Sequence, residues 1–223
     1  ATIELCLANN RPALNSVRTN TLKISRENLK QELQEQGISC RESKFVPEGL
    51  IIDGFGSLDE ITAFHEGRFV LQDEASMVVA HVVAPRPNSF IIDACAAPGT
   101  KTTHLAQLIG DNGQVIACDI HEHKMGLIEE NCKRLELRSI KTKLLDARKI
   151  GLEFSRKADF LLVDAPCSGL GVLRRRPDSR WKKTQEQIRD IKQLQLEILR
   201  GACDCLKPGG VLVYSTCSIA PEE

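Results

Sequence analysis

Short apolar runs alternate with longer amphipathic stretches from Ser89 to the end of the chain. The runs are rich in isoleucine, valine and leucine, and all but the third are almost entirely apolar, as in strands that are covered on both faces. This alternation predicts an α/β fold with a parallel sheet. The predicted strands are residues 90–94, 114–120, 141–146, 159–164 and 210–215.

The stretches between these runs carry apolar residues at helical spacing. In the last of them Ile188, Ile191 and Leu194 recur every third residue, and Pro208 and Gly209 supply the signals that stop the helix. The predicted helices are residues 101–109, 121–137, 148–154 and 184–206.

The first part of the chain has the pattern of a small α+β unit. The elements expected there are a strand at 16–22, a helix at 25–36 ended by Gly37, and short strands at 40–46 and 50–53. Residues 55–67 join this unit to a further helix at 73–83. We therefore predict a small domain at 1–66 and a main domain at 67–223.

Composition narrows the class of protein. With 223 residues, 42% of them hydrophobic, the chain can bury a sizeable core, and no apolar run approaches the roughly 18 residues that cross a bilayer. The N-terminus has no basic stretch followed by an apolar one, so we expect a cytoplasmic location. The nine cysteines are odd in number and include no C-x-x-C pair, so we expect reduced thiols and no metal. A monomer is favoured.

Charge is balanced over the whole chain but not locally. Thirty basic and thirty acidic side chains cancel, so any contact with a nucleic acid must come from a local cluster. Residues 173–183, which we call the basic segment, hold one acid and six bases together with Trp181. These bases are Arg174, Arg175, Arg176, Arg180, Lys182 and Lys183.

A loop of small residues follows the first strand of the main domain. It reads Asp93-Ala94-Cys95-Ala96-Ala97-Pro98-Gly99-Thr100-Lys101 and opens onto a helix. In open parallel sheets, ligands bind at the carboxyl ends of strands, where small residues let bare amides approach them. The loop lacks the three-glycine dinucleotide fingerprint, which disfavours an NAD site.

Acidic residues recur at this edge of the predicted sheet. Asp119, Asp146 and Asp164 end the second, third and fourth strands. A carboxylate only accepts hydrogen bonds, so Asp119 suits the two hydroxyls of a ribose. Each acid alone could instead cap the helix that follows it. The three together with the loop favour a binding site.

Two cysteines, Cys167 and Cys217, follow the ends of the fourth and fifth strands. Neighbouring strand ends would bring both thiols to one pocket, although they are far apart in sequence. Free cysteines are often small buried apolar residues, whereas reactive thiols occupy polar, partly open sites. The position of both beside Asp164 favours a chemical role.

Three motifs resemble the RNA cytosine-C5 methyltransferase family, and within it the bacterial 16S ribosomal RNA enzymes. They are DACAAPGTK at 93–101, DAPCSGLG at 164–171 and YSTCSI at 214–219. The resemblance implies a Rossmann-like class I methyltransferase domain that binds S-adenosylmethionine, preceded by a small RNA-recognition-like domain. It places the cofactor against Cys95, Ala96, Ala97, Pro98, Gly99, Thr100 and Lys101, with Asp119 on the ribose, Asp146 near the adenine and Asp164 beside the base.

The resemblance also implies the chemistry. Carbon 5 of cytosine is a poor nucleophile, and a thiolate that adds to carbon 6 turns the ring into an enamine that can attack a methyl sulfonium. Cys217 would be this nucleophile, Asp164 would bind the N3 and amino edge, and Cys167 would assist loss of the C5 proton and product release. Lys101 would reach the cofactor or substrate. DNA cytosine-C5 enzymes use the Pro-Cys thiol instead, so the two roles could be exchanged.

RNA is the expected partner. Arg174, Arg175, Arg176 and Arg180 would contact phosphates at the mouth of the pocket, and the target base must leave any stack. In the small domain, Arg18 and Asn20 are the expected RNA contacts.

Two other readings stay open: an N-directed base methyltransferase, and a non-catalytic RNA-binding subunit on the same scaffold. The former commonly has an aromatic where Cys167 stands, and two intact cysteines argue against the latter. Typical bacterial relatives have an additional helical domain before this region and an antiparallel hairpin after the fifth strand, so the sequence is expected to be a fragment.

Overall fold

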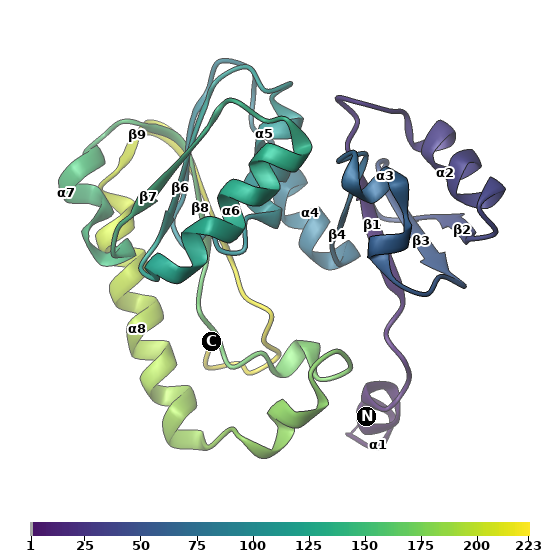
Figure 1. Ribbon diagram of the computed structural model, residues 1–223. Coiled ribbons are helices and arrows are strands. Elements are labelled where there is room, and N and C mark those ends of the chain that lie inside the picture. Colours follow the sequence, from purple (N-terminus) through teal and green to yellow (C-terminus); the bar gives the residue numbers. More distant parts are fainter. Residues whose placement is uncertain (1) are drawn as a thin grey trace.

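The computed structural model describes residues 2–223 and contains two β-sheets, which Figure 1 shows side by side. The first is a four-stranded antiparallel sheet in the order β2-β3-β1-β4, and the second is a five-stranded parallel sheet in the order β7-β6-β5-β8-β9. The small sheet comprises β1 (Asn15–Thr19), β2 (Ser39–Glu42), β3 (Gly49–Asp53) and β4 (Phe69–Leu71). The main sheet comprises β5 (Phe90–Asp93), β6 (Gln114–Asp119), β7 (Ile140–Leu144), β8 (Ala158–Asp164) and β9 (Leu206–Ser215).

Helix α2 (Arg26–Glu35) packs on the small sheet. The Ser25 side chain caps its first turn by accepting the amide of Asn28. Leu29 and Leu33 lie one turn apart, and both are buried against Val17 of β1 and its neighbours. The unit also contains α3 (Thr62–His65) and a 3-10 turn at Leu58–Glu60, whereas α1 (Thr2–Asn9) lies apart from the small sheet in Figure 1.

Strand β4 is a departure from the expected elements. It pairs antiparallel with β1, with Val70 opposite Arg18, so it belongs to the small sheet although it lies beyond residue 66. Three residues are too short a run to show an alternating pattern, which is why the sequence did not reveal it. The division of the chain at residues 66 and 67 stays a prediction.

Helices cover both faces of the main sheet. Ile91 of β5 faces α4 (Glu74–Val83), α5 (Thr100–Leu108) and α6 (Glu122–Leu135), whereas its neighbour Ile92 faces α7 (Ile150–Phe154) and α8 (Gln185–Cys203). Leu161 and Leu162 of β8 divide between the same two cores, because successive side chains point to opposite faces of a sheet. The predicted α/β fold is therefore confirmed.

All five predicted strands of the main sheet are present and parallel. Strand β9 begins earlier than expected, because Leu206 already pairs with Ala158 before an irregularity in the ladder. The strand order reverses between β5 and β8, and in open sheets such a reversal marks the binding edge. Within residues 2–223, no helix has both the length and the apolar character required to cross a bilayer.

Candidate active site

The small-residue loop lies between β5 and α5, at the point where the strand order reverses. It contains a cis peptide between Ala97 and Pro98, and Gly99 ends it with φ of 96°. A side chain on Gly99 would place its Cβ 3.2 Å from the Cα of Ile128 in α6. Only glycine combines this backbone conformation with so close an approach of loop and helix.

Asp93 fixes the start of α5 to the end of β5. Its side chain is completely buried, and Oδ2 accepts a hydrogen bond from the Thr102 hydroxyl at 2.7 Å. Burial raises the pKa of Asp93 to about 7, because a charge in an apolar surrounding is costly. Its other oxygen, Oδ1, is buried and accepts no hydrogen bond of good geometry from residues 2–223.

The acids at the ends of β6 and β7 are held by backbone amides. Asp119 Oδ2 accepts the amide of Ala97 at 3.2 Å, and Oδ1 accepts the amide of His121 at 2.9 Å. Asp146 accepts the amide of Arg148 at 2.9 Å and forms an ion pair with its guanidinium. The hydrogen bond from Arg148 lowers the pKa of Asp146. Asp119 therefore links the two strand ends, while Asp146 caps the turn that follows β7.

Asp164 lies at the end of β8 between two donors. Lys101 Nζ is 2.5 Å from Oδ2, and the Ser215 hydroxyl donates to Oδ1 at 2.7 Å. A lysine in the first turn of a helix is unfavourable next to the helix dipole, and the ion pair with Asp164 compensates for this. The structure thus joins Lys101, Asp164 and β9 in one polar group.

Cys167 and Cys217 meet at the carboxyl ends of β8 and β9, with Sγ atoms 3.1 Å apart. Asp164 lies opposite Ser215 in the β-ladder, which brings the two cysteine turns side by side. Cys217 is exposed and Cys167 is half-buried. The hydrogen bond from Cys217 lowers the pKa of Cys167 to about 6, and the same bond raises the pKa of Cys217. The hydrogen bond therefore favours the thiolate on Cys167 and the thiol on Cys217.

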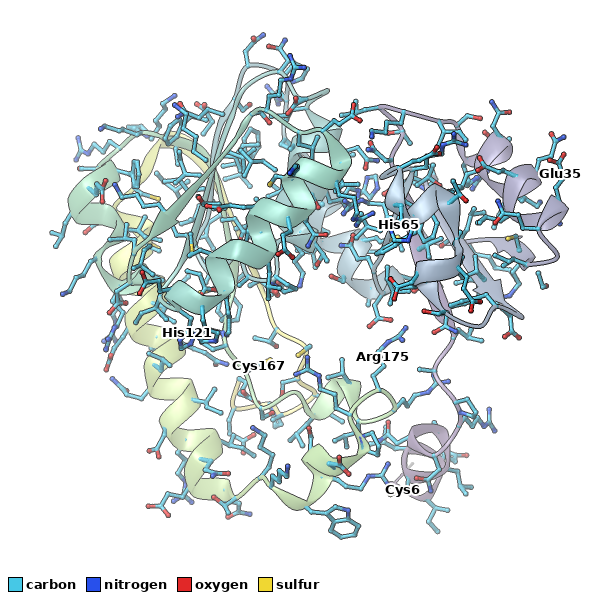
Figure 2. All side chains as sticks on the ribbon, viewed as in Figure 1. Cys6, Glu35, His65, His121, Cys167 and Arg175 are labelled. Atoms are coloured by element: carbon cyan, nitrogen blue, oxygen red, sulfur yellow. The ribbon has the colours of Figure 1, made fainter. Side chains whose placement is uncertain are left out.

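The arginines of the basic segment lie near the amino-terminal part of the chain. In Figure 2 the labelled Arg175 and Cys167 both lie on the stretch that follows β8. Arg174, Arg175 and Arg176 are exposed, and Arg180 is partly buried. Arg174, Arg175 and Arg180 donate hydrogen bonds to other parts of the chain. Their partners are the carbonyls of Asn9, Arg11, Pro12 and Leu14, the Asn10 side chain and the Asp73 carboxylate. Their contact with RNA stays a prediction.

Arg18 and Asn20 do not have the position expected for RNA contacts. Arg18 is 1% exposed and Asn20 is 2% exposed. Arg18 donates to the Thr100 carbonyl at 2.7 Å and to the Thr103 hydroxyl at 2.9 Å, and Asn20 donates to the Leu135 carbonyl. Both side chains connect the small sheet to the main domain, so the expectation of direct RNA contact was wrong.

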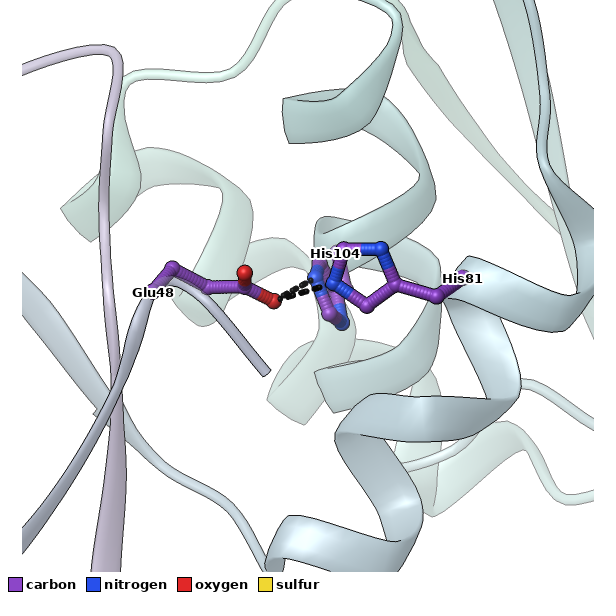
Figure 3. Close-up of side chains that lie close together, drawn as sticks. All are labelled: Glu48, His81 and His104. Atoms are coloured by element: carbon purple, nitrogen blue, oxygen red, sulfur yellow. Dashed lines mark hydrogen bonds and ion pairs between the residues drawn. The ribbon is translucent and has the colours of Figure 1, made fainter. Parts of the chain in front are cut away.

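A second polar group, shown in Figure 3, lies at the same junction. Glu48 Oε1 is 2.8 Å from His81 Nε2 and 2.7 Å from His104 Nε2. Burial lowers the pKa of His104 to about 3, so its ring is neutral at physiological pH. Within residues 2–223 these three side chains have ligand atoms close enough to hold a metal ion. His81 Nε2 can donate to the shared carboxylate oxygen, whereas neither ring nitrogen of His104 has a hydrogen-bond partner of good geometry within residues 2–223.

Several residues of the cysteine turns escaped the sequence reasoning. The Gly171 amide donates to the Cys217 carbonyl at 2.9 Å, and Ser168 and Ser218 have hydroxyls 3.0 Å apart. Each of these serines directly follows one of the paired cysteines. The repeated Cys-Ser step was therefore the available signal.

Comparison with known proteins identifies both parts of the chain. Residues 80–223 match the family described as 16S rRNA methyltransferase RsmB/F, and residues 1–59 match the ferredoxin-like domain of the same proteins. Ribosomal RNA small subunit methyltransferase B of Proteus mirabilis is 38% identical over 93% of this chain and 49% of its own length. The tRNA (cytosine(72)-C(5))-methyltransferase of Pyrococcus horikoshii is 43% identical over 75% of this chain and 42% of its own length.

Solved structures agree with this assignment. The structure of NSun6 from Pyrococcus horikoshii with SFG has a TM-score of 0.88 and 30% identity, covering 96% of this chain and 78% of that one. The chain spans about half the length of the curated relatives it matches. Its parallel sheet is the Rossmann-like fold of class I S-adenosylmethionine-dependent methyltransferases, and it is preceded by a ferredoxin-like unit. The chain belongs to the 16S rRNA methyltransferase RsmB/F family.

Proposed function

We propose that this chain methylates carbon 5 of a cytosine in RNA, with 16S ribosomal RNA as the substrate and S-adenosylmethionine as the methyl donor. The observation that carries the proposal is the thiol pair. Cys167 and Cys217 have Sγ atoms 3.1 Å apart, and Asp164 ends β8, the strand that Cys167 follows. A ribosomal substrate also favours action in the cytoplasm, where ribosomes are found.

The loop after β5 has the chemistry required for the cofactor. Asp119 accepts one amide on each oxygen and retains lone pairs for ribose hydroxyls. Asp146 would lie toward the adenine. When bound, S-adenosylmethionine supplies an electrophilic methyl group to carbon 5.

The protein's own groups supply the remaining chemistry. Cys217 Sγ adds to carbon 6 of the base, and its proton passes to the Cys167 thiolate across their 3.1 Å contact. The carbon 5–carbon 6 double bond is thereby opened to an enamine. Asp164 would hold the N3 and amino edge of the ring, and Lys101 would hold Asp164.

Release requires a base near carbon 5. Cys167 gives its proton to water and, as a thiolate again, removes the C5 proton; the Cys217–carbon 6 bond then breaks. Because the two sulfurs are 3.1 Å apart, a base that is bonded to Cys217 would lie within reach of Cys167, which supports this role.

Cysteine variants test the function and the order of the two roles. Cys217→Ala should abolish both methylation and the denaturation-resistant complex with 5-fluorocytosine RNA. Cys167→Ala should accumulate a stalled adduct on ordinary RNA. A normal trapped adduct in Cys217→Ala would reverse the two roles. An unaltered protein that folds and binds the cofactor but never traps 5-azacytidine RNA would instead be a non-catalytic scaffold.

The basic segment is proposed to bind the RNA backbone at the entrance to this site. Replacing Arg174, Arg175 and Arg176 by alanine should weaken RNA binding and flatten its salt dependence, because fewer counterions are released. Affinity that stays unchanged across a salt series would exclude this role.

A further inference from the structure

The paired cysteines lie beyond the part of the chain that the main sheet holds. The last bond between the two strand ends runs from the Ala165 amide to the Ser215 carbonyl, at 2.9 Å. Cys167 and Cys217 follow that bond by two residues each. The ladder therefore brings the two turns together but leaves the separation of the sulfurs to other contacts.

One carboxylate joins the two turns. Glu223 Oε1 accepts the Ser168 amide at 2.6 Å, and Oε2 accepts the Ser168 hydroxyl at 2.5 Å and the Ser218 hydroxyl at 2.6 Å. The two hydroxyls are 3.0 Å apart. Because Ser168 follows Cys167 and Ser218 follows Cys217, a single side chain is bonded next to both thiols.

The carboxylate is in turn attached to a rigid element. Gln195 on α8 is 3% exposed, and its Nε2 donates to Glu223 Oε1 at 3.2 Å and to the Pro166 carbonyl at 2.9 Å. Pro166 directly precedes Cys167. A buried side chain of a long helix thus fixes the carboxylate and one cysteine turn at the same time.

Glu223 is charged in this arrangement. Burial opposes its ionisation, but the hydrogen bonds from Ser168, Ser218 and Gln195 outweigh it and lower the pKa of Glu223. A carboxylate accepts hydrogen bonds without donating any, which suits a site where three donors converge. Its negative charge also raises the pKa of Cys167, which opposes the larger lowering by Cys217. Geometry and charge can therefore be separated by mutation.

We propose that Glu223 is a positioning residue that sets the separation of the Cys167 and Cys217 sulfurs through Ser168 and Ser218. The proposal rests on the proposed function, in which Cys167 must reach the C5 proton of a base that is bonded to Cys217. Without Glu223 the two turns would still be joined by the bond from the Gly171 amide to the Cys217 carbonyl and by the contact of the two serine hydroxyls, but the sulfurs would be held in contact less of the time.

Chemical cross-linking measures the sulfur separation without any need for catalysis. Diamide oxidises two neighbouring thiols to a disulfide, and its N=N bond takes up the two hydrogens. Peptide mapping then gives the rate at which the Cys167–Cys217 bond forms. Glu223→Ala should slow this rate by about tenfold or more, which corresponds to about 1.4 kcal/mol. Glu222→Ala is the matched control, since Glu222 is exposed and bonds neither turn within the described chain.

Glu223→Gln separates bridging from charge. Its amide oxygen can accept the Ser168 amide, and its NH2 group can donate to the two hydroxyls, which also accept hydrogen bonds. The bridge is therefore retained, and cross-linking should stay within about threefold of the unaltered protein. Thermal unfolding identifies any variant that has lost its fold. Cross-linking in Glu223→Ala at the unaltered rate, or in Glu223→Gln as slow as in Glu223→Ala, would overturn the proposal.

The adduct assay connects this geometry to catalysis. With cytosine RNA and cofactor, Glu223→Ala should accumulate a denaturation-resistant complex, because Cys167 no longer reaches the C5 proton. A Glu223→Ala protein that traps 5-fluorocytosine RNA normally but accumulates nothing on cytosine RNA would contradict the proposal. If the unaltered protein traps no RNA at all, the proposed function fails, while slow cross-linking in Glu223→Ala would still establish the positioning role.

Discussion

Replacement of Gly171 by alanine should displace Cys217, the proposed nucleophile, without altering its thiol. The Cβ of the new residue would lie 2.8 Å from the Cys217 carbonyl oxygen and 3.2 Å from its carbon. The Gly171 amide donates a hydrogen bond to that same carbonyl at 2.9 Å. Ordinary contact begins at 3.4 Å, so the Cys217 backbone must retreat by about 0.6 Å.

The expected effect follows from this displacement. Misplacing a reacting group by about 1 Å can cost about 10²-fold in rate, so 0.6 Å corresponds to roughly tenfold slower adduct formation. The strain should also lower the free energy of unfolding by about 1–3 kcal/mol, as for other overpacked sites. Single-turnover trapping of 5-fluorocytosine RNA measures the first quantity, and urea unfolding measures the second.

Gly126→Ala is the control for this experiment. Gly126 lies within α6, and nothing lies within 4 Å of the position that a Cβ would occupy there. Alanine should therefore stabilise the helix by up to about 1 kcal/mol and leave trapping unchanged. If Gly171→Ala traps RNA as fast as the unaltered protein at unchanged stability, the carbonyl contact does not position Cys217.

Three further predictions concern the cofactor loop and the junction between the two sheets. Asp119→Ala should weaken binding of S-adenosylhomocysteine by about tenfold or more in calorimetry, through loss of the acceptor for the ribose; unchanged affinity would remove Asp119 from the site. Arg18→Leu should lower the free energy of unfolding by about 3 kcal/mol, because three hydrogen bonds that the buried guanidinium donates are lost. Unchanged stability with an altered salt dependence of RNA binding would instead support direct contact of Arg18 with RNA. The buried His104 should lower stability by about 1.4 kcal/mol per pH unit as pH drops from about 6.5 toward about 3, because the unfolded chain binds a proton that the buried ring does not. The raised pKa of Asp93 acts in the opposite direction, so urea unfolding at several pH values is compared between the unaltered protein and His104→Gln, and identical pH slopes in the two would contradict the burial of His104.

The central strands of the main sheet could be predicted from the sequence because β5, β6 and β8 are buried on both faces. Continuous apolar runs such as residues 90–92 are typical of such strands, whereas the edge strands β7 and β9 are only partly buried. Parallel strands also bring their carboxyl ends to one edge, so the meeting of Cys167 and Cys217 followed from topology alone. Their 3.1 Å separation did not, because it depends on irregular turns beyond the ladder.

The junction between the sheets was not predictable in the same way. Arg18 occupies a strand position where a charged residue usually points to solvent, and its burial depends on acceptors about 80 residues further along the chain. Glu223 contacts Ser168 across a separation of 55 residues, and no periodic pattern records such a pair. Side chains that bond across long separations are fixed by the assembled fold rather than by local sequence.

The bond from Arg18 to the Thr100 carbonyl has a mechanical consequence. Thr100 immediately precedes Lys101, which grips Asp164 beside the thiols. A force on the small sheet would thus be transmitted to α5 by the Arg18 guanidinium at its first turn and by Gln107, which donates to the Thr19 carbonyl. Movement of the ferredoxin-like unit would therefore shift the helix turn that holds Lys101 against Asp164, next to the two cysteines.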